Sequence, residues 1–192
     1  HQPRRQRQMC IRDRVYAGHQ FGNWVPQLGD GRAHLLGEVL DREGNKYDLQ
    51  LKGSGRTPYS RGGDGKAWLG PVIREYVVSE YMNNIHIPTT RSLSAVLTGD
   101  NVYREETYPG AVLCRVARPH IRVGTFQYFY SRKDTKSLKI LADYFIEHHF
   151  PNLEKNENKY FELFKNVVDG QINLVTSWMK VGFIHGVMNT DN

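Results

Sequence analysis

The sequence predicts an α+β protein, and three observations support this fold class. Residues 33–53 read as a β-hairpin, residues 68–84 carry apolar side chains at helical spacing, and residues 138–181 return to a helical pattern after further β-like runs. The sheet should therefore come from the first part of the chain. The second part should be helical.

The hairpin is expected from Ala33 to Leu40 and from Lys46 to Lys52, because apolar residues alternate along its second half. Residues 53–66 hold five glycines and one proline, a composition that predicts no regular element. A helix should follow from Trp68 to about Asn84, with Pro71 in its first turn.

Two or three β-like runs follow, at residues 92–97, 111–117 and 126–130, with breaks at Gly99-Asp100 and Pro109-Gly110. Helices are then expected over residues 138–150 and 160–181. This order is typical of the bilobal protein-kinase-like fold. We therefore expect a leader over residues 1–14, an amino-terminal lobe over 15–130, and the start of a helical carboxyl-terminal lobe over 131–192 that ends in the catalytic loop.

The composition limits the possible partners. The 192 residues are 39% hydrophobic, and no stretch reaches the roughly 20 apolar residues of a membrane span. Of the net charge of +6, five arginines and one aspartate place +4 in residues 1–14, which leaves +2 for the rest and argues against nucleic acid. The two cysteines supply no disulfide framework, which suits a reducing compartment.

The leader has no apolar core, so it is not a secretory signal. It is read either as part of a mitochondrial transit peptide or as extraneous sequence, and the leader is expected to be disordered or extraneous. A chain that begins at His1 and ends inside a motif is expected to be incomplete at both ends.

A glycine turn, a lysine and a glutamate are the first candidates for chemistry. Gly29 and Gly31 would let backbone N–H groups approach phosphate oxygens, and Arg32 adds a positive charge. Lys52 closes a strand, and Glu75 lies on the following helix, where it could hold the lysine toward a phosphate. Each also has an ordinary interpretation, as a simple turn and as a pair of solvated charges.

Further candidates lie in the glycine-rich loop and after the sheet. Asp64 and Gly65 could contact a base or ribose, or form an Asx turn. Arg115 and Arg122 bracket a short segment, and two guanidinium groups suit polyphosphate recognition.

The last residues resemble a kinase-type catalytic loop. His185 and Asn192 keep the spacing of such a loop, but Val187 occupies the position of the usual Asp. Asp191 could accept a proton and Asn192 could bind Mg²⁺ through its carbonyl oxygen. The alternative is an exposed polar turn.

Long strings of the chain resemble the selenoprotein O family, also called YdiU. The resemblance runs from about Val15 to Asn192, on the following segments: residues 16–22, 26–33, 51–61, 74–75, 87–91 and 185–192.

The resemblance implies a pseudokinase fold that binds ATP in a flipped orientation and transfers AMP to hydroxyl side chains of proteins. It implies these site residues: Gly29, Gly31, Arg32, Lys52, Asp64, Gly65, Arg115 and Arg122 for ATP, Glu75 to orient the lysine, Asp191 as proton acceptor and Asn192 for the metal. A second metal ligand, an Asp, would lie beyond Asn192.

The expected cofactors are ATP as substrate and Mg²⁺, with Mn²⁺ as an alternative, and the expected partners are proteins that carry hydroxyl side chains. A monomer is expected, located in mitochondria in a eukaryote or in the cytoplasm of a bacterium. Two rival hypotheses remain, a phosphotransferase and an ATP-binding scaffold without turnover. We also expect the 192-residue chain alone to be inactive and poorly stable, because apolar helix faces would lack partners.

Overall fold

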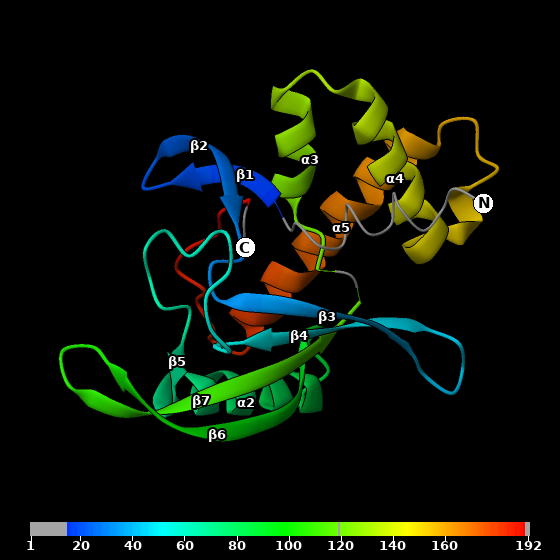
Figure 1. Ribbon diagram of the computed structural model, residues 1–192. Helices are drawn as coiled ribbons and strands as arrows, with labels where there is room; N and C mark the ends of the chain where they lie inside the picture. The colour runs from blue at the N-terminus through cyan, green and yellow to red at the C-terminus, as the bar shows by residue number, and fades with distance from the viewer. Residues whose placement is uncertain (1–14, 119, 191–192) are drawn as a thin grey trace. The chain divides into compact units, whose positions relative to one another are not determined.

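The computed structural model describes residues 15–118 and 120–190, and these form two compact units. Unit 1 contains residues 15 and 28–121, and unit 2 contains residues 16–27 and 122–190. Figure 1 labels the helices and strands of both units. The α+β class is confirmed. The expected lobe boundary at residues 130 and 131 stays a prediction.

Unit 1 is built on an antiparallel sheet in the order β3-β4-β7-β5, with β6 also paired to β7. Its strands are β3 (Ala33–Leu40), β4 (Lys46–Lys52), β5 (Ala67–Trp68), β6 (Arg91–Tyr103) and β7 (Thr107–Ala117). The predicted β3–β4 hairpin is confirmed. Its turn is closed by Asp41, whose side chain accepts bonds from the backbone N–H of Glu43 at 2.9 Å and of Asn45 at 2.8 Å.

Strands β6 and β7 are longer than predicted, because the expected breaks lie within them. Gly99-Asp100 falls inside β6, where the register with β7 shifts between Leu97 and Asn101. Pro109-Gly110 falls inside β7. A bulge with Gly99 at φ 81° lets the strand continue where the sequence suggested a turn.

Helix α2 (Leu69–Asn84) confirms the predicted helix and packs on β6 and β7, as Figure 1 shows. Val72 on this helix is buried at 2% exposure, against Ala67 of β5 and Ala111 and Leu113 of β7. This cluster joins the helix to the sheet. It therefore fixes where side chains on α2 lie relative to β4 and β7.

Residues 16–27 of unit 2 form most of a hairpin that was not predicted. Strands β1 (Val15–Gln20) and β2 (Asn23–Gly29) pair across a two-residue turn at Phe21-Gly22. Both turn residues have positive φ, 52° and 79°, as the tight hairpin turns of antiparallel strands require.

The predicted strand over residues 126–130 is wrong, because these residues lie in helix α3 (Val123–Ser131). Aromatic residues favour strands, but Phe126 packs against the helical core of unit 2 and contacts Phe145 edge-on. The Thr125 hydroxyl accepts the N–H of Arg122 at 3.3 Å at the start of the helix. Packing and capping thus override local propensity.

The two other predicted helices are confirmed as α4 (Thr135–His149) and α5 (Lys159–Lys180), with the short 3-10 helix η1 (Pro151–Leu153) between them. Their buried core consists of Ala142, Ile146, Leu153 and Leu163.

Helix α5 carries a broad exposed apolar surface. Phe161, Phe164 and Met179 are 65%, 66% and 71% exposed, while Leu163 is the residue of α5 that is buried. Exposed apolar side chains gathered in this way are typical of surfaces that contact protein, ligand or membrane. Among residues 15–190, no helix is both long and apolar enough to cross a membrane.

Replacing Leu113 by alanine tests the unit 1 core. Leu113 is fully buried, so Leu113→Ala should lower the free energy of unfolding by about 2–5 kcal/mol. The measurement is denaturant unfolding of the natural full-length protein. Leu40→Ala is the control, since this side chain is 65% exposed and its loss should cost far less. Equal losses would contradict the packing described.

Candidate functional site

A three-membered ion network joins the sheet of unit 1 to helix α2. The Lys52 ammonium, at the end of β4, donates to Glu75 Oε2 at 2.5 Å. The Arg115 guanidinium, from β7, donates to Glu75 Oε1. One carboxylate of α2 therefore binds a cation from each of two neighbouring strands, and Lys52 and Glu75 form the pair expected from the sequence.

The network shifts the pKa of both Lys52 and Glu75. Burial lowers the pKa of Lys52 and the neighbouring Arg115 lowers it further, while Glu75 offsets part of the change. Burial alone would raise the pKa of Glu75, but Arg115 and Lys52 outweigh it and hold that pKa below its ordinary value. Glu75 therefore stays ionised between its two partners at neutral pH.

A buried polar chain continues the network to the glycine turn. Arg115 Nη1 donates to Gln50 Oε1 at 3.3 Å, and Gln50 Nε2 donates to Asp30 Oδ2 at 3.0 Å. Gln50 is fully buried and Asp30 is 8% exposed. The sequence interpretation missed both residues. Strand alternation was the available signal, since Gln50 shares a face of β4 with Lys52.

A small pocket lies beside the ion network. Its volume is about 80 Å³, and its lining consists of Arg32, Lys52, Lys66, Ala67, Trp68, Pro71, Val72, Glu75 and Arg104. Four of these residues are basic and one is acidic, so the pocket attracts anions. Whole small-molecule sites usually measure about 300–1,000 Å³, so this pocket suits one anionic group of a larger ligand. Lys66 and Arg104 were not predicted.

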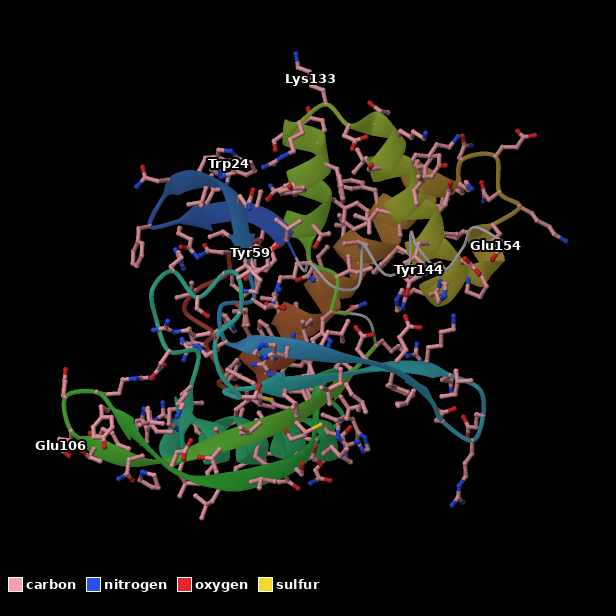
Figure 2. The ribbon with its side chains drawn as sticks, in the orientation of Figure 1. Trp24, Tyr59, Glu106, Lys133, Tyr144 and Glu154 are labelled. Carbon is pink, nitrogen blue, oxygen red and sulfur yellow. The ribbon has the colours of Figure 1, made fainter. Side chains whose placement is uncertain are left out.

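Gly29 and Gly31 are required by packing within unit 1. A Cβ on Gly29 would lie 2.2 Å from the ring of Tyr59, which Figure 2 labels, and a Cβ on Gly31 would lie 2.9 Å from the carbonyl oxygen of Tyr59. The hydroxyl of Ser60 also donates to the carbonyl oxygen of Gly31 at 2.5 Å. The 53–66 loop thus packs directly against the turn at Gly29 and Gly31. The contact of this turn with phosphate stays a prediction.

Asp64 and Gly65 shape the end of the same loop. Both carboxylate oxygens of Asp64 accept bonds from Arg104, at 2.8 Å each, and Oδ1 also accepts the N–H of Lys66 at 3.0 Å. These bonds, led by that from Arg104, lower the pKa of Asp64 to about 2. Gly65 has φ 66°, and a Cβ there would lie 1.9 Å from the carbonyl oxygen of Gly55.

Arg122 belongs to unit 2, where it precedes α3 and lies 4.4 Å from the centre of the Tyr16 ring. The same helix start contacts the end of the described chain. Gly124 N–H donates to Thr190 O at 2.6 Å, and the Thr190 hydroxyl donates to Gln127 Oε1 at 2.6 Å.

Unit 2 therefore brings the residue before Asp191 to the helix that follows Arg122. Asp191 and Asn192 themselves lie outside the described residues.

The larger cavity in unit 2, about 350 Å³, is lined by Tyr130, Ser131, Lys133, Thr135 and Leu138, and contains none of the predicted site residues.

The described residues contain no cluster of three His, Cys, Asp or Glu side chains that could hold a metal ion. The carboxylates nearest the pocket are already engaged, Glu75 by two cations and Asp64 by Arg104. The predicted metal ligand Asn192 lies outside the described residues.

Fold and site together define an α+β protein with a basic pocket beside a lysine–glutamate–arginine network, a site suited to phosphate groups. Comparison of the sequence with known families is more specific. The family described as protein adenylyltransferase SelO matches residues 5–192, so the chain belongs to this family. The resemblance predicted from the sequence is confirmed.

Curated relatives agree with this assignment. The chain is 64% identical over 178 residues to the protein nucleotidyltransferase YdiU of Rhizobium rhizogenes, covering 93% of this chain and 36% of the relative. Proteins of the same name from Nitrobacter hamburgensis and Alkalilimnicola ehrlichii are 64% and 61% identical over the same length. The chain thus spans about a third of the length of the relatives it matches, 35% and 36% of these two.

Two glycines of the 53–66 loop provide a test of its geometry. Gly65→Ala should destabilise the loop, because the new Cβ would overlap the Gly55 carbonyl and alanine disfavours positive φ by about 1–2 kcal/mol. Gly62→Ala is the matched control, with φ 83° and no atom within 4 Å of the new Cβ.

Limited proteolysis within residues 53–66 measures the effect of both changes. Gly65→Ala should be cleaved faster than Gly62→Ala. Equal cleavage of the two variants would show that the close approach of Gly65 to Gly55 is absent.

Proposed function

We propose that this protein transfers AMP from ATP to hydroxyl groups of Ser, Thr or Tyr side chains of other proteins. The observation that carries the proposal is the Lys52–Glu75–Arg115 network beside a basic pocket, in a chain 64% identical to proteins named nucleotidyltransferases. Membership of a family described as protein adenylyltransferases supports the choice of AMP as the group transferred.

In the proposed reaction, the hydroxyl oxygen of the acceptor attacks the α-phosphorus of ATP. The bond from this phosphorus to the oxygen that bridges it to the β-phosphate breaks, and pyrophosphate leaves with that oxygen. The proton of the hydroxyl passes to the Asp191 carboxylate. Lys52, which lines the pocket, and Arg115, from the adjoining ion network, would stabilise the charge that develops on the pyrophosphate.

The proposal also includes the fold, the ATP-binding residues and the metal ligand expected from the sequence. The fold would be that of a protein kinase, with the sheet and α2 of unit 1 as part of its amino-terminal lobe. Gly29, Gly31, Arg32 and Arg122 would contribute to the ATP site. Asn192 would bind Mg²⁺ or Mn²⁺, which supplies positive charge at the phosphates when bound.

Labelled ATP distinguishes AMP transfer from phosphate transfer. The natural full-length protein is incubated with a protein acceptor and with ATP labelled at either the α- or the γ-phosphate. We expect label on protein from the α position and none from the γ position. Label from the γ position alone would overturn the proposal in favour of a phosphotransferase, and nucleotide binding without either transfer would favour a scaffold.

Lys52→Ala should reduce the kcat/KM of this transfer by about 10²-fold or more, because it removes a cation that would stabilise the departing pyrophosphate. Lys155→Ala is the control, since this exposed lysine lies in unit 2 outside the proposed site. Unfolding curves of both variants separate loss of the charge from loss of the fold.

The pH dependence of ATP binding tests the ion network. Lys52 must be charged to attract phosphate, and its pKa lies below the ordinary 10.5. As the pH rises, affinity for a non-hydrolysable ATP analogue should therefore begin to fall before pH 10.5 is reached. Glu75 raises the pKa of Lys52, so Glu75→Gln should move this fall to still lower pH.

Glu80→Gln is the control, because Glu80 lies on the same helix but pairs with Arg91. Calorimetric titration across the alkaline range provides the affinities. An unchanged alkaline profile in Glu75→Gln would contradict the assigned role of the network.

A further inference from the structure

The 53–66 loop is attached to the rest of unit 1 at its beginning and at its end by different partners. At its beginning, the ring nitrogens of His34 bond Ser54 Oγ at 2.9 Å and Arg56 O at 3.0 Å. At its end, the loop meets the hairpin formed by β6 and β7, whose turn is marked by Glu106 in Figure 2. The second attachment depends on Arg104.

Arg104 binds the loop with all four of its terminal N–H donors engaged. Nη1 donates to Asp64 Oδ2 at 2.8 Å and to Tyr103 O at 2.7 Å. Nη2 donates to Asp64 Oδ1 at 2.8 Å and to Lys66 O at 3.1 Å. A guanidinium group has four such terminal donors, and in Arg104 all four bond groups of this protein. These donors therefore hold the loop and do not bind a ligand.

The loop segment that Arg104 holds forms part of the basic pocket. Lys66 lines that pocket together with Arg32 and Lys52. Its ammonium group donates to Asp100 Oδ2 on β6 at 3.1 Å, which uses one of three N–H donors. Lys66 is therefore placed at the pocket by two contacts with the β6–β7 hairpin, one through its side chain and one through its backbone carbonyl.

We propose that Arg104 is a positioning residue for ATP, because it clamps Asp64 and the Lys66 carbonyl and so keeps the Lys66 ammonium at the basic pocket. This inference rests on the proposed function for the identity of the ligand. It assigns the β6–β7 hairpin, which no sequence motif singled out, to the nucleotide site. It also gives Asp64 a role in holding the loop through Arg104.

Strand β6, which ends at the residue before Arg104, offers a matched control. Arg91 forms an equivalent two-bond pair with Glu80, at 2.9 and 2.7 Å, and this pair lies outside the residues that line the pocket. Both pairs are partly exposed, with the Arg91 and Arg104 side chains 50% and 38% exposed. Removal of either arginine should thus lower stability slightly and by similar amounts.

The first measurement needs no nucleotide. Amide hydrogen exchange of residues 53–66 in the natural full-length protein should accelerate in Arg104→Ala and stay unchanged in Arg91→Ala. The second measurement is steady-state AMP transfer, in which Arg104→Ala should raise the KM for ATP by about 10-fold with a smaller effect on kcat. Arg104→Lys keeps the charge but loses the two-bond contact with Asp64, so it should give an intermediate KM. This variant still provides a result if Arg104→Ala fails to fold.

Equal exchange and equal KM in Arg104→Ala and Arg91→Ala would overturn the inference. Asp64→Ala combined with Arg104→Ala should raise KM no further than either change alone, and fully additive effects would also overturn it. A wild-type protein that neither binds ATP nor transfers AMP would refute the proposed function instead. In that case the exchange comparison still decides whether Arg104 holds the loop.

Discussion

The Glu75 carboxylate holds the site of unit 1 together, because it binds a cation from each of two strands. β4 supplies Lys52, β7 supplies Arg115, and α2 supplies the carboxylate between them. Partly buried charges are costly unless they are paired, so the sheet and the helix must keep their relative placement for the pairing to survive. The apolar cluster around Val72 and Leu113 provides that placement. The ion pairs of the site therefore depend on the packing of the core of unit 1.

The ion network and the basic pocket beside it hold their cations in different ways. Lys52 and Arg115 are 26% and 19% exposed and share one partner, whereas Lys66 is 41% exposed and is held through a loop. Burial strengthens electrostatic attraction and exposure weakens it. Lys52 and Arg115 are thus held firmly by Glu75, while the position of the Lys66 charge depends on the loop.

Sequence periodicity was sufficient for the elements whose side chains alternate or repeat regularly, including the β3–β4 hairpin, α2, α4 and α5. The Lys52–Glu75 pair was predicted from another signal, the kinase-type pattern of a strand lysine followed by a helix glutamate, read together with the glycine turn and the loop at residues 185–192. Periodicity failed for residues 126–130, where packing of Phe126 overrides aromatic strand propensity. Asp30, Gln50 and Arg104 were missed because their importance arises from partners distant in sequence, which no local pattern records.

Unit 2 consists of two chain segments with the whole of residues 28–121 between them. Its contacts join those segments directly, since Arg122 lies over Tyr16 and Gly124 packs against the Ala17 carbonyl. Closing so long a connection costs conformational entropy before any contact compensates for it. Unit 1 is nearly continuous in sequence and can gather its own contacts first. Chain topology therefore favours the local contacts of unit 1 over those that join the two segments of unit 2.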